Sequence, residues 1–240
     1  MRRLALVLAV AAASLLPMPA NAVLPRDAMA IEQALADLGM PVGVVDGVWD
    51  RDTGRATCVW RELTGRTVLR SWPVVAERPA IKTTATLQIP RYMKTGLNIN
   101  QQCQTAVWVA SEYVAVDVTH IDPLSGETIT VPQVKSMRII KRIMTVSTGM
   151  AAFPTTTGEH VVGWKVDRWW QSTIYPDGKM YRPFFFHDGM AIHGSSSDDL
   201  VKWYPASHGC VRMLHTDIDA LWDEGFGVGD RVLVYGTWLG

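Results

Sequence analysis

The sequence predicts a mainly β protein in which a β-sandwich or barrel-like domain follows a small α-helical module. Residues 23 to 70 contain apolar residues at helical spacing. From about residue 80, short runs rich in β-branched and aromatic residues alternate with turn signals, which is typical of all-β domains. With 240 residues, 48% of them hydrophobic, the chain can bury a substantial core.

The N-terminus has the three parts of a secretory signal peptide. A cationic start at Arg2 and Arg3 is followed by an apolar run over residues 4–16 and by the small-residue triplet Ala20-Asn21-Ala22. The run is too short to cross the ~30 Å hydrocarbon core of a bilayer as a helix. We therefore expect residues 1–22 to be removed, leaving a secreted, extracytoplasmic protein without a stable membrane span, in a compartment where disulfides persist.

Two short helices are expected in the module, which we place at residues 23–70. The first is expected to be capped by Asp27 and to end at Gly39, and the second to be capped by Asp52 and to end at Gly65. A turn at 46–47 separates them. Their apolar faces consist of Ile31, Ala34, Leu35 and Leu38 in the first and Ala56, Val59, Trp60 and Leu63 in the second. Residues 71–80, with two prolines, are expected to form a linker.

The β domain is expected to cover residues 81–240. Its predicted strands lie at 106–109, 113–116, 139–146, 161–166, 181–186, 190–192 and 231–235. Turns are expected at 123–126 and at His187-Asp188-Gly189, which would join a hairpin. One late helix is predicted, capped by Thr216 and ended by Gly225.

The charge balance gives no electrostatic footprint for nucleic acid. The chain has 23 Lys and Arg residues against 23 Asp and Glu residues, and removal of the first 22 residues would take away two of the basic ones. We therefore expect no nucleic-acid partner.

A candidate thiol catalytic site lies between His193 and Arg212. The run 207–212 reads Ser-His-Gly-Cys-Val-Arg. A thiol near pKa 8.5 needs a base to become a nucleophile, and a nearby histidine can take its proton. A backbone carbonyl can orient that imidazole, and backbone N–H groups can stabilise an oxyanion. Gly209, next to Cys210, would let the backbone approach a substrate.

Other interpretations of these residues stay open at this point. Cys210 could be a small buried side chain, and the histidines could be ordinary core residues. Zinc could be bound by His193, His208 and Cys210, with Asp198, Asp199 or His215 as a fourth ligand. The polar neighbours of Cys210 disfavour an apolar environment, and the sequence has no C-x-x-C partner for zinc.

Ile192-His193-Gly194, followed by Ser207-His208-Gly209-Cys210-Val211-Arg212-Met213, closely resembles the signature of the L,D-transpeptidases. The resemblance extends over about residues 85 to 236 and includes the stretches 146–149 and 229–232. It departs from the family at 115–134, which looks like an inserted hairpin, and at Thr155-Thr156-Thr157. Upstream, Leu35 to Trp60 resembles a peptidoglycan-binding module, although its last third after Gly65 is not recognisable.

The resemblance implies an enzyme that joins peptidoglycan stem peptides at the cell wall. Cys210 would attack the third stem residue of a tetrapeptide, release D-alanine and form a thioester, which an amine would resolve to a 3→3 cross-link. His193 would be the base, held by the Gly194 carbonyl. His208 and Gly209 would line the oxyanion site, and Ser207 and Arg212 would orient the substrate or the loop. No metal or organic cofactor is implied.

Two alternatives remain for the function. The same site could serve a secreted thiol carboxypeptidase or peptidase, or the chain could be a non-catalytic wall-binding protein.

If Cys210 is the nucleophile, two of the three cysteines remain. In an oxidising compartment we expect Cys58 and Cys103 to form a disulfide that ties the helical module to the β domain.

Overall fold

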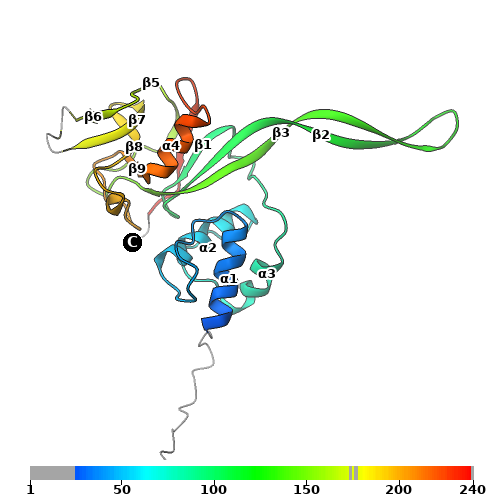
Figure 1. Cartoon of the computed structure of the whole chain (residues 1–240), viewed down its shortest axis with the longest axis horizontal. Helices are drawn as coiled ribbons and strands as arrows, with labels where there is room; N and C mark the ends of the chain where they lie inside the picture. Colours follow the sequence, from blue (N-terminus) through cyan, green and yellow to red (C-terminus); the bar gives the residue numbers. More distant parts are fainter. Residues whose placement is uncertain (1–24, 173–174, 176–177, 239–240) are drawn as a thin grey trace, which may run out of the picture.

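A computed structural model describes residues 25–172, 175 and 178–238 of the chain. The expected signal peptide, residues 1–22, lies outside the described residues. Within them, helices of the N-terminal part lie beside a large sheet from which a long two-stranded arm projects (Figure 1).

The helical module contains both expected helices, α1 (Pro25–Asp37) and α2 (Arg51–Leu63). The predicted caps are wrong at both N-termini. Asp27 lies inside α1, and the cap of α2 is Asp50, whose carboxylate accepts from the amides of Asp52 and Thr53. The predicted ends are confirmed, because Gly39 and Gly65 follow the two helices at positive φ.

The segment expected to be a linker is partly helical. It contains the short 3-10 turn η1 (Val75–Glu77), and α3 (Arg78–Thr83) follows directly, with Pro79 in its first turn. Arg61 of α2 forms a two-point ion pair with Glu77 and also donates to the carbonyls of Leu69 and Ser71. These bonds fix residues 69–77 against α2.

The β domain is built on one mixed sheet of ten strands. Its path is β4-β10-β1-β2-β3-β9-β8-β7-β5, with β6 also paired to β7. The strands are β1 (Gly96–Asn100), β2 (Thr105–Ile121), β3 (Thr128–Ser147), β4 (Gly158–Val161), β5 (Trp164–Lys165), β6 (Trp169–Gln171), β7 (Lys179–His187), β8 (Met190–Gly194), β9 (Val211–Met213) and β10 (Arg231–Tyr235). Only β1–β10 and β8–β9 pair in parallel among the described strands.

The two halves of this sheet share one core. Leu97 and Val232 from one half are fully buried in the same cluster as Phe184 and Ile192 from the other. Ile218 and Leu221 of α4 (His215–Asp223) complete this cluster. The predicted cap of α4 is wrong: Thr216 lies inside the helix, and the capping position is Leu214. The mainly β fold with a preceding helical module is confirmed.

The strands predicted at 106–109 and 113–116 are one continuous strand. β2 pairs with β3 from Thr105↔Thr145 out to Ile121↔Thr128, with a bulge between Trp108 and Val109. The outer part is the arm of Figure 1, whose strands pair only with each other. The polar residues between the two predicted runs do not end the strand, because both faces of a two-stranded ribbon are in water.

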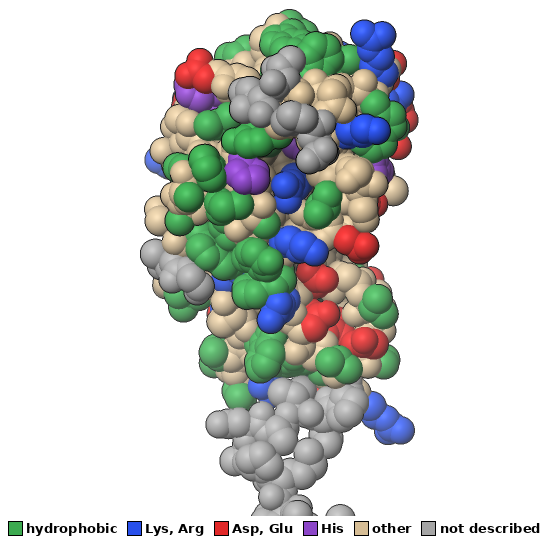
Figure 2. All heavy atoms as spheres, turned by 90° about the vertical axis from the view of Figure 1, so that its left-hand side faces the viewer, with side chains coloured by type: hydrophobic (Ala, Val, Ile, Leu, Met, Phe, Trp, Pro, Cys, Tyr) green, Lys and Arg blue, Asp and Glu red, His purple; other side chains and the backbone are tan. Residues whose placement is uncertain are grey.

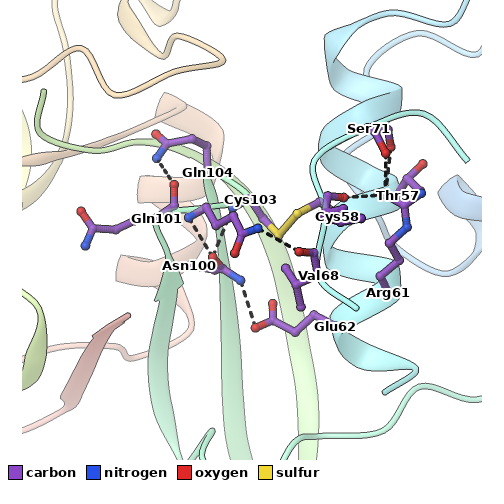
Figure 3. Close-up of a disulfide and its surroundings, with 12 residues drawn as sticks. Thr57, Cys58, Arg61, Glu62, Val68, Ser71, Asn100, Gln101, Cys103 and Gln104 are labelled. Carbon is purple, nitrogen blue, oxygen red and sulfur yellow. Dashed lines mark hydrogen bonds between the residues drawn. A yellow bond between two sulfur atoms is a disulfide. The ribbon is translucent and has the colours of Figure 1, made fainter. Parts of the chain in front are cut away.

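The helical module packs directly on the sheet. Leu35 and Trp60 of the module share a buried cluster with Val107, Val109 and Ile143 of the sheet. The predicted disulfide between Cys58 in α2 and Cys103 after β1 is present, and both residues are fully buried (Figure 3). The module and the sheet are therefore joined by apolar contact and by a covalent bond.

Candidate active site

Two neighbouring parallel strands position the histidine and the cysteine. In the β8–β9 pair, Ile192 lies opposite Val211 and His193 opposite Arg212. Because side chains alternate along a strand, His193 and Arg212 lie on the same face of the sheet. Cys210 lies immediately before the first residue of β9 and, two residues before Arg212, is on the same face.

The two side chains line one pocket of about 280 Å³. The pocket brings together five of the predicted site residues, and its other walls come from β7, from the β7–β8 turn and from the loop between β8 and β9. Its lining includes His193, Ser207, His208, Cys210, Arg212, Ser195, Ser196, Leu200, Tyr175, Lys179 and Met190. Of the other predicted site residues, Gly194 ends β8, and Gly209, next to Cys210, has a φ of +107°, which favours glycine.

His193 is held as a neutral imidazole. It is 6% exposed, and its Nδ1 lies 2.7 Å from the carbonyl oxygen of Gly194. A carbonyl only accepts, so Nδ1 donates and Nε2 is left with a lone pair. Burial lowers the pKa of His193 to about 4, and the charge of Arg212 acts in the same direction, against the Gly194 bond. The imidazole is therefore neutral at physiological pH.

Cys210 is a free thiol with a raised pKa. Burial raises the pKa of this thiol, while a backbone hydrogen bond at Ala191 and the charge of Arg212 oppose the increase. At neutral pH the resting pair is consequently thiol and imidazole rather than thiolate and imidazolium. Such a pair can perform nucleophilic chemistry if the imidazole takes the thiol proton during the attack.

Comparison with protein families matches residues 128–234 to the L,D-transpeptidase catalytic domain. These residues form an L,D-transpeptidase domain. The chain is 26% identical in sequence to an L,D-transpeptidase fragment from Xylanimonas cellulosilytica whose crystal structure is known. The two structures match with a TM-score of 0.52, and the match covers 87% of this chain and 93% of that one. An L,D-transpeptidase structure from Stackebrandtia nassauensis is 20% identical, with a TM-score of 0.49 and coverage of 88% and 92%. The comparison with curated proteins found no match.

In this L,D-transpeptidase domain, the backbone around the cysteine is fixed by two hydroxyl groups. Ser207 Oγ donates to the carbonyl of Cys210 at 2.5 Å. Thr155 Oγ1 donates to the carbonyl of Gly209 at 2.9 Å and accepts from the amide of Gly149 at 2.8 Å. Thr155 is 2% exposed and was not among the predicted site residues. The sequence signal for it was the threonine stretch 155–157, which stood out only as a departure from the family pattern.

His208 lines the pocket and contacts two other aromatic rings. Its ring is stacked on Tyr175, with centroids 4.8 Å apart, and contacts Phe153 edge-on at 5.0 Å. Figure 2 shows the face of the molecule on which the catalytic part lies above the helical module, with hydrophobic side chains gathered beside Lys and Arg across the middle. The lining of the pocket itself includes the aromatic rings of Tyr175 and His208 and the basic groups of Lys179 and Arg212.

Asp198 and His215, two of the residues suggested as a fourth zinc ligand, bind each other. Asp198 accepts from His215 Nδ1 at 2.8 Å and from the backbone amide of His215 at 3.0 Å. In the ranges that the structure describes, no three His, Cys, Asp or Glu side chains are grouped as metal ligands. No helix among the described residues is long and apolar enough to cross a membrane.

Proposed function

We propose that this L,D-transpeptidase acts on peptidoglycan stem peptides with Cys210 as its nucleophile and His193 as its base. The observation that carries the proposal is the pairing of a free thiol and a neutral imidazole in one pocket, with the Nδ1 of that imidazole bound to Gly194. The Gly194 bond fixes the tautomer in which Nε2 can accept a proton.

The first half of the reaction forms a thioester. The Cys210 sulfur attacks the carbonyl carbon of the third stem residue, a diaminopimelate, while its proton moves to His193 Nε2. Collapse of the tetrahedral adduct breaks the bond to D-alanine, whose nitrogen takes the proton from His193. The developing oxyanion would be met by the backbone amides at 208–210, whose geometry is held by Thr155 and Ser207.

The second half transfers the acyl group. An amine of a neighbouring stem attacks the thioester carbonyl, loses a proton to His193 and releases the thiol, which gives a 3→3 cross-link. Water in place of the amine gives a shortened stem, the carboxypeptidase outcome. We propose cross-linking as the main reaction, with Arg212 holding the loop that shapes the pocket.

The site of action is proposed to be outside the cytoplasmic membrane, at the cell wall. The buried Cys58–Cys103 disulfide supports this, because such bonds persist in oxidising compartments. We also retain the division into a signal peptide (1–22), a helical module (23–70) and a catalytic domain (81–240) as a proposal.

One experiment tests the chemistry. Mature protein is incubated with a disaccharide tetrapeptide, and the intact mass, the D-alanine released and the muropeptide products are measured. We expect a thioester adduct on the wild type and none on Cys210→Ala, together with 3→3 dimers. Unchanged turnover in Cys210→Ala would refute the proposal. If the wild type gave only hydrolysis products, the cross-linking part of the proposal would be refuted. A protein substrate serves as the control for a general thiol peptidase.

A further inference from the structure

The loop from Ser195 to Ser207 connects the strand of His193 to the cysteine segment and forms one wall of the pocket. Its central part has little secondary structure beyond the one-turn η2 (Asp198–Leu200). Because this wall lies beside both reacting side chains, its position determines the shape of the pocket.

Four carbonyl groups of this loop, at every second residue, accept hydrogen bonds from side chains outside it. Arg212 donates to Leu200 O and Ala206 O at 3.4 and 3.2 Å, and Ser147 donates to Tyr204 O at 2.9 Å. Lys202 O is bound by Arg55 Nη2 at 3.4 Å. Three of these contacts come from the catalytic domain, but Arg55 belongs to α2 of the helical module.

Arg55 joins three parts of the protein. It is 3% exposed, and its Nη1 donates to Thr145 Oγ1 of β3 at 2.9 Å and pairs with Asp52 at 3.1 Å. Burial lowers the pKa of Arg55, and Asp52 and Asp50 oppose that effect, but an arginine remains charged in proteins. The planar guanidinium can therefore bridge Thr145 and Lys202 in a fixed geometry, which a lysine cannot reproduce.

A second contact holds the same loop through a side chain. The guanidinium of Arg51 lies 3.8 Å from the centroid of the Trp203 ring, and that of Arg70 lies 4.7 Å from it. Both arginines belong to the N-terminal region. Cys58, one helical turn after Arg55, fixes α2 to the sheet through Cys103 (Figure 3).

We propose that Arg55 is a positioning residue of the active site, through which the helical module holds the loop 195–207 in its catalytic position. Arg51 supports it by stacking on Trp203. The module is then part of the catalytic unit, whatever else it binds. This inference rests on the proposed function, because it requires that the pocket beside the loop is the catalytic one.

The test compares variants that remove one support at a time. Arg55→Lys keeps the charge but loses the planar guanidinium that binds Thr145 and Lys202, and Arg55→Gln loses the charge. Arg51→Ala removes the exposed contact with the Trp203 ring without opening the core. Arg66→Ala is the matched control, since Arg66 stacks on Trp60 inside the module, at 4.6 Å, and is not one of the residues that hold the loop. For each variant, two rates are measured: thioester formation on the tetrapeptide and alkylation of Cys210 by iodoacetamide. Iodoacetamide is small enough to react without contacting the loop 195–207.

We expect Arg55→Gln to lower kcat for thioester formation about tenfold or more, because small displacements in an active site are costly. Arg55→Lys should recover little of the loss, Arg51→Ala should lose a smaller factor, and Arg66→Ala should match the wild type. Alkylation should stay unchanged in all four variants. Thioester formation at the wild-type rate in folded Arg55→Gln and Arg51→Ala would overturn the inference. A wild type that forms no Cys210 thioester would instead overturn the proposed function.

Discussion

His193 Nδ1 and the carbonyl oxygen of the next residue, Gly194, are joined by a 2.7 Å hydrogen bond at the end of β8. The acceptor is backbone, so it carries no charge that could hold a proton on the imidazole. This distinguishes the site from one in which a carboxylate orients the histidine and stabilises the imidazolium. Burial can therefore lower the pKa of His193 to about 4 without opposition from an anion.

Thioester formation should keep its rate well below neutral pH. His193 accepts a proton only when neutral, so the rate should be constant from pH 7 to about 5 and should fall as the pH drops through about 4. The measurement is the second-order rate of thioester formation against pH, with circular dichroism to verify folding. Iodoacetamide alkylation is the control, since it requires the thiolate and should rise with pH. A midpoint near 6.5 for thioester formation would contradict the prediction.

The same pKa makes His193 a cause of acid instability. The folded pKa lies below the unfolded value, so the unfolded state binds more protons between pH 6.5 and about 4, and stability falls as the pH drops through this window. A shift of this size corresponds to roughly 3 kcal/mol. Denaturant titrations should show that His193→Gln loses less unfolding free energy than the wild type between pH 7 and pH 4.5. Equal losses would show that His193 is not the source.

Replacing both Cys58 and Cys103 by alanine should destabilise the folded chain. The two residues are 45 apart in sequence, and a closed loop of that size lowers the entropy of the unfolded state by an amount worth about 4 kcal/mol. The free energy of unfolding is measured without reductant, and Cys210→Ala is the control that should leave it nearly unchanged. Thiol titration should find one free thiol in the wild type. It should also find one in the double variant, both folded and unfolded.

The sequence was sufficient for the features that depend on local pattern or on a family signature. The glycine helix ends, the hairpin at His187 to Gly189 and the closing strand at 231–235 follow from local backbone preferences and are present. The clustering of His193 and Cys210 in one pocket follows from the signature, because β8 and β9 are neighbours in the sheet.

What the sequence did not predict depends on contacts between distant segments. Asp50 and Asp52 are equally plausible caps by residue type, and the tertiary position of the turn before α2 decides between them. Thr155 and Arg55 act on backbone carbonyls 54 and 147 residues away. Glu62 looks like an ordinary surface residue of a helix, and only packing of the module on the sheet buries it.

Replacing Glu62 should reveal a buried polar junction between the module and the sheet. Its Oε1 accepts from Tyr92, Asn100 and Tyr235 at 2.7 to 3.0 Å, and burial raises the pKa of the carboxyl. Glu62→Ala would leave three donors without their acceptor, which should cost about 2–4 kcal/mol of unfolding free energy. Glu62→Gln keeps one oxygen and should cost less.

The pH dependence separates the role of Glu62 from that of simple packing. A raised folded pKa means that the native state holds the proton better, so the carboxyl contributes stability that is lost as the pH rises through the folded pKa. Glu62→Gln, which resembles the protonated acid, should therefore lose less stability between pH 5 and pH 8 than the wild type. Glu112→Ala, on the exposed arm, is the matched control and should change neither the unfolding free energy nor its pH dependence. Parallel pH curves for wild type and Glu62→Gln would contradict this role.

The β2–β3 arm should be dispensable for folding. The buried core clusters contain no residue between Ala110 and Ile139, and Tyr113 and Leu124 are 82% and 96% exposed. Replacing residues 114–135 by Asn-Gly would close the ribbon at the Tyr113↔Ser136 pair with a turn that matches strand twist. Because an isolated ribbon adds little stability in water, we expect a change in unfolding free energy within about 1 kcal/mol. Thioester formation on a soluble tetrapeptide should be retained, since the pocket includes no arm residue. A loss of several kcal/mol would mean that the arm packs against the body in solution, and retained stability with lost activity would place the arm in substrate binding.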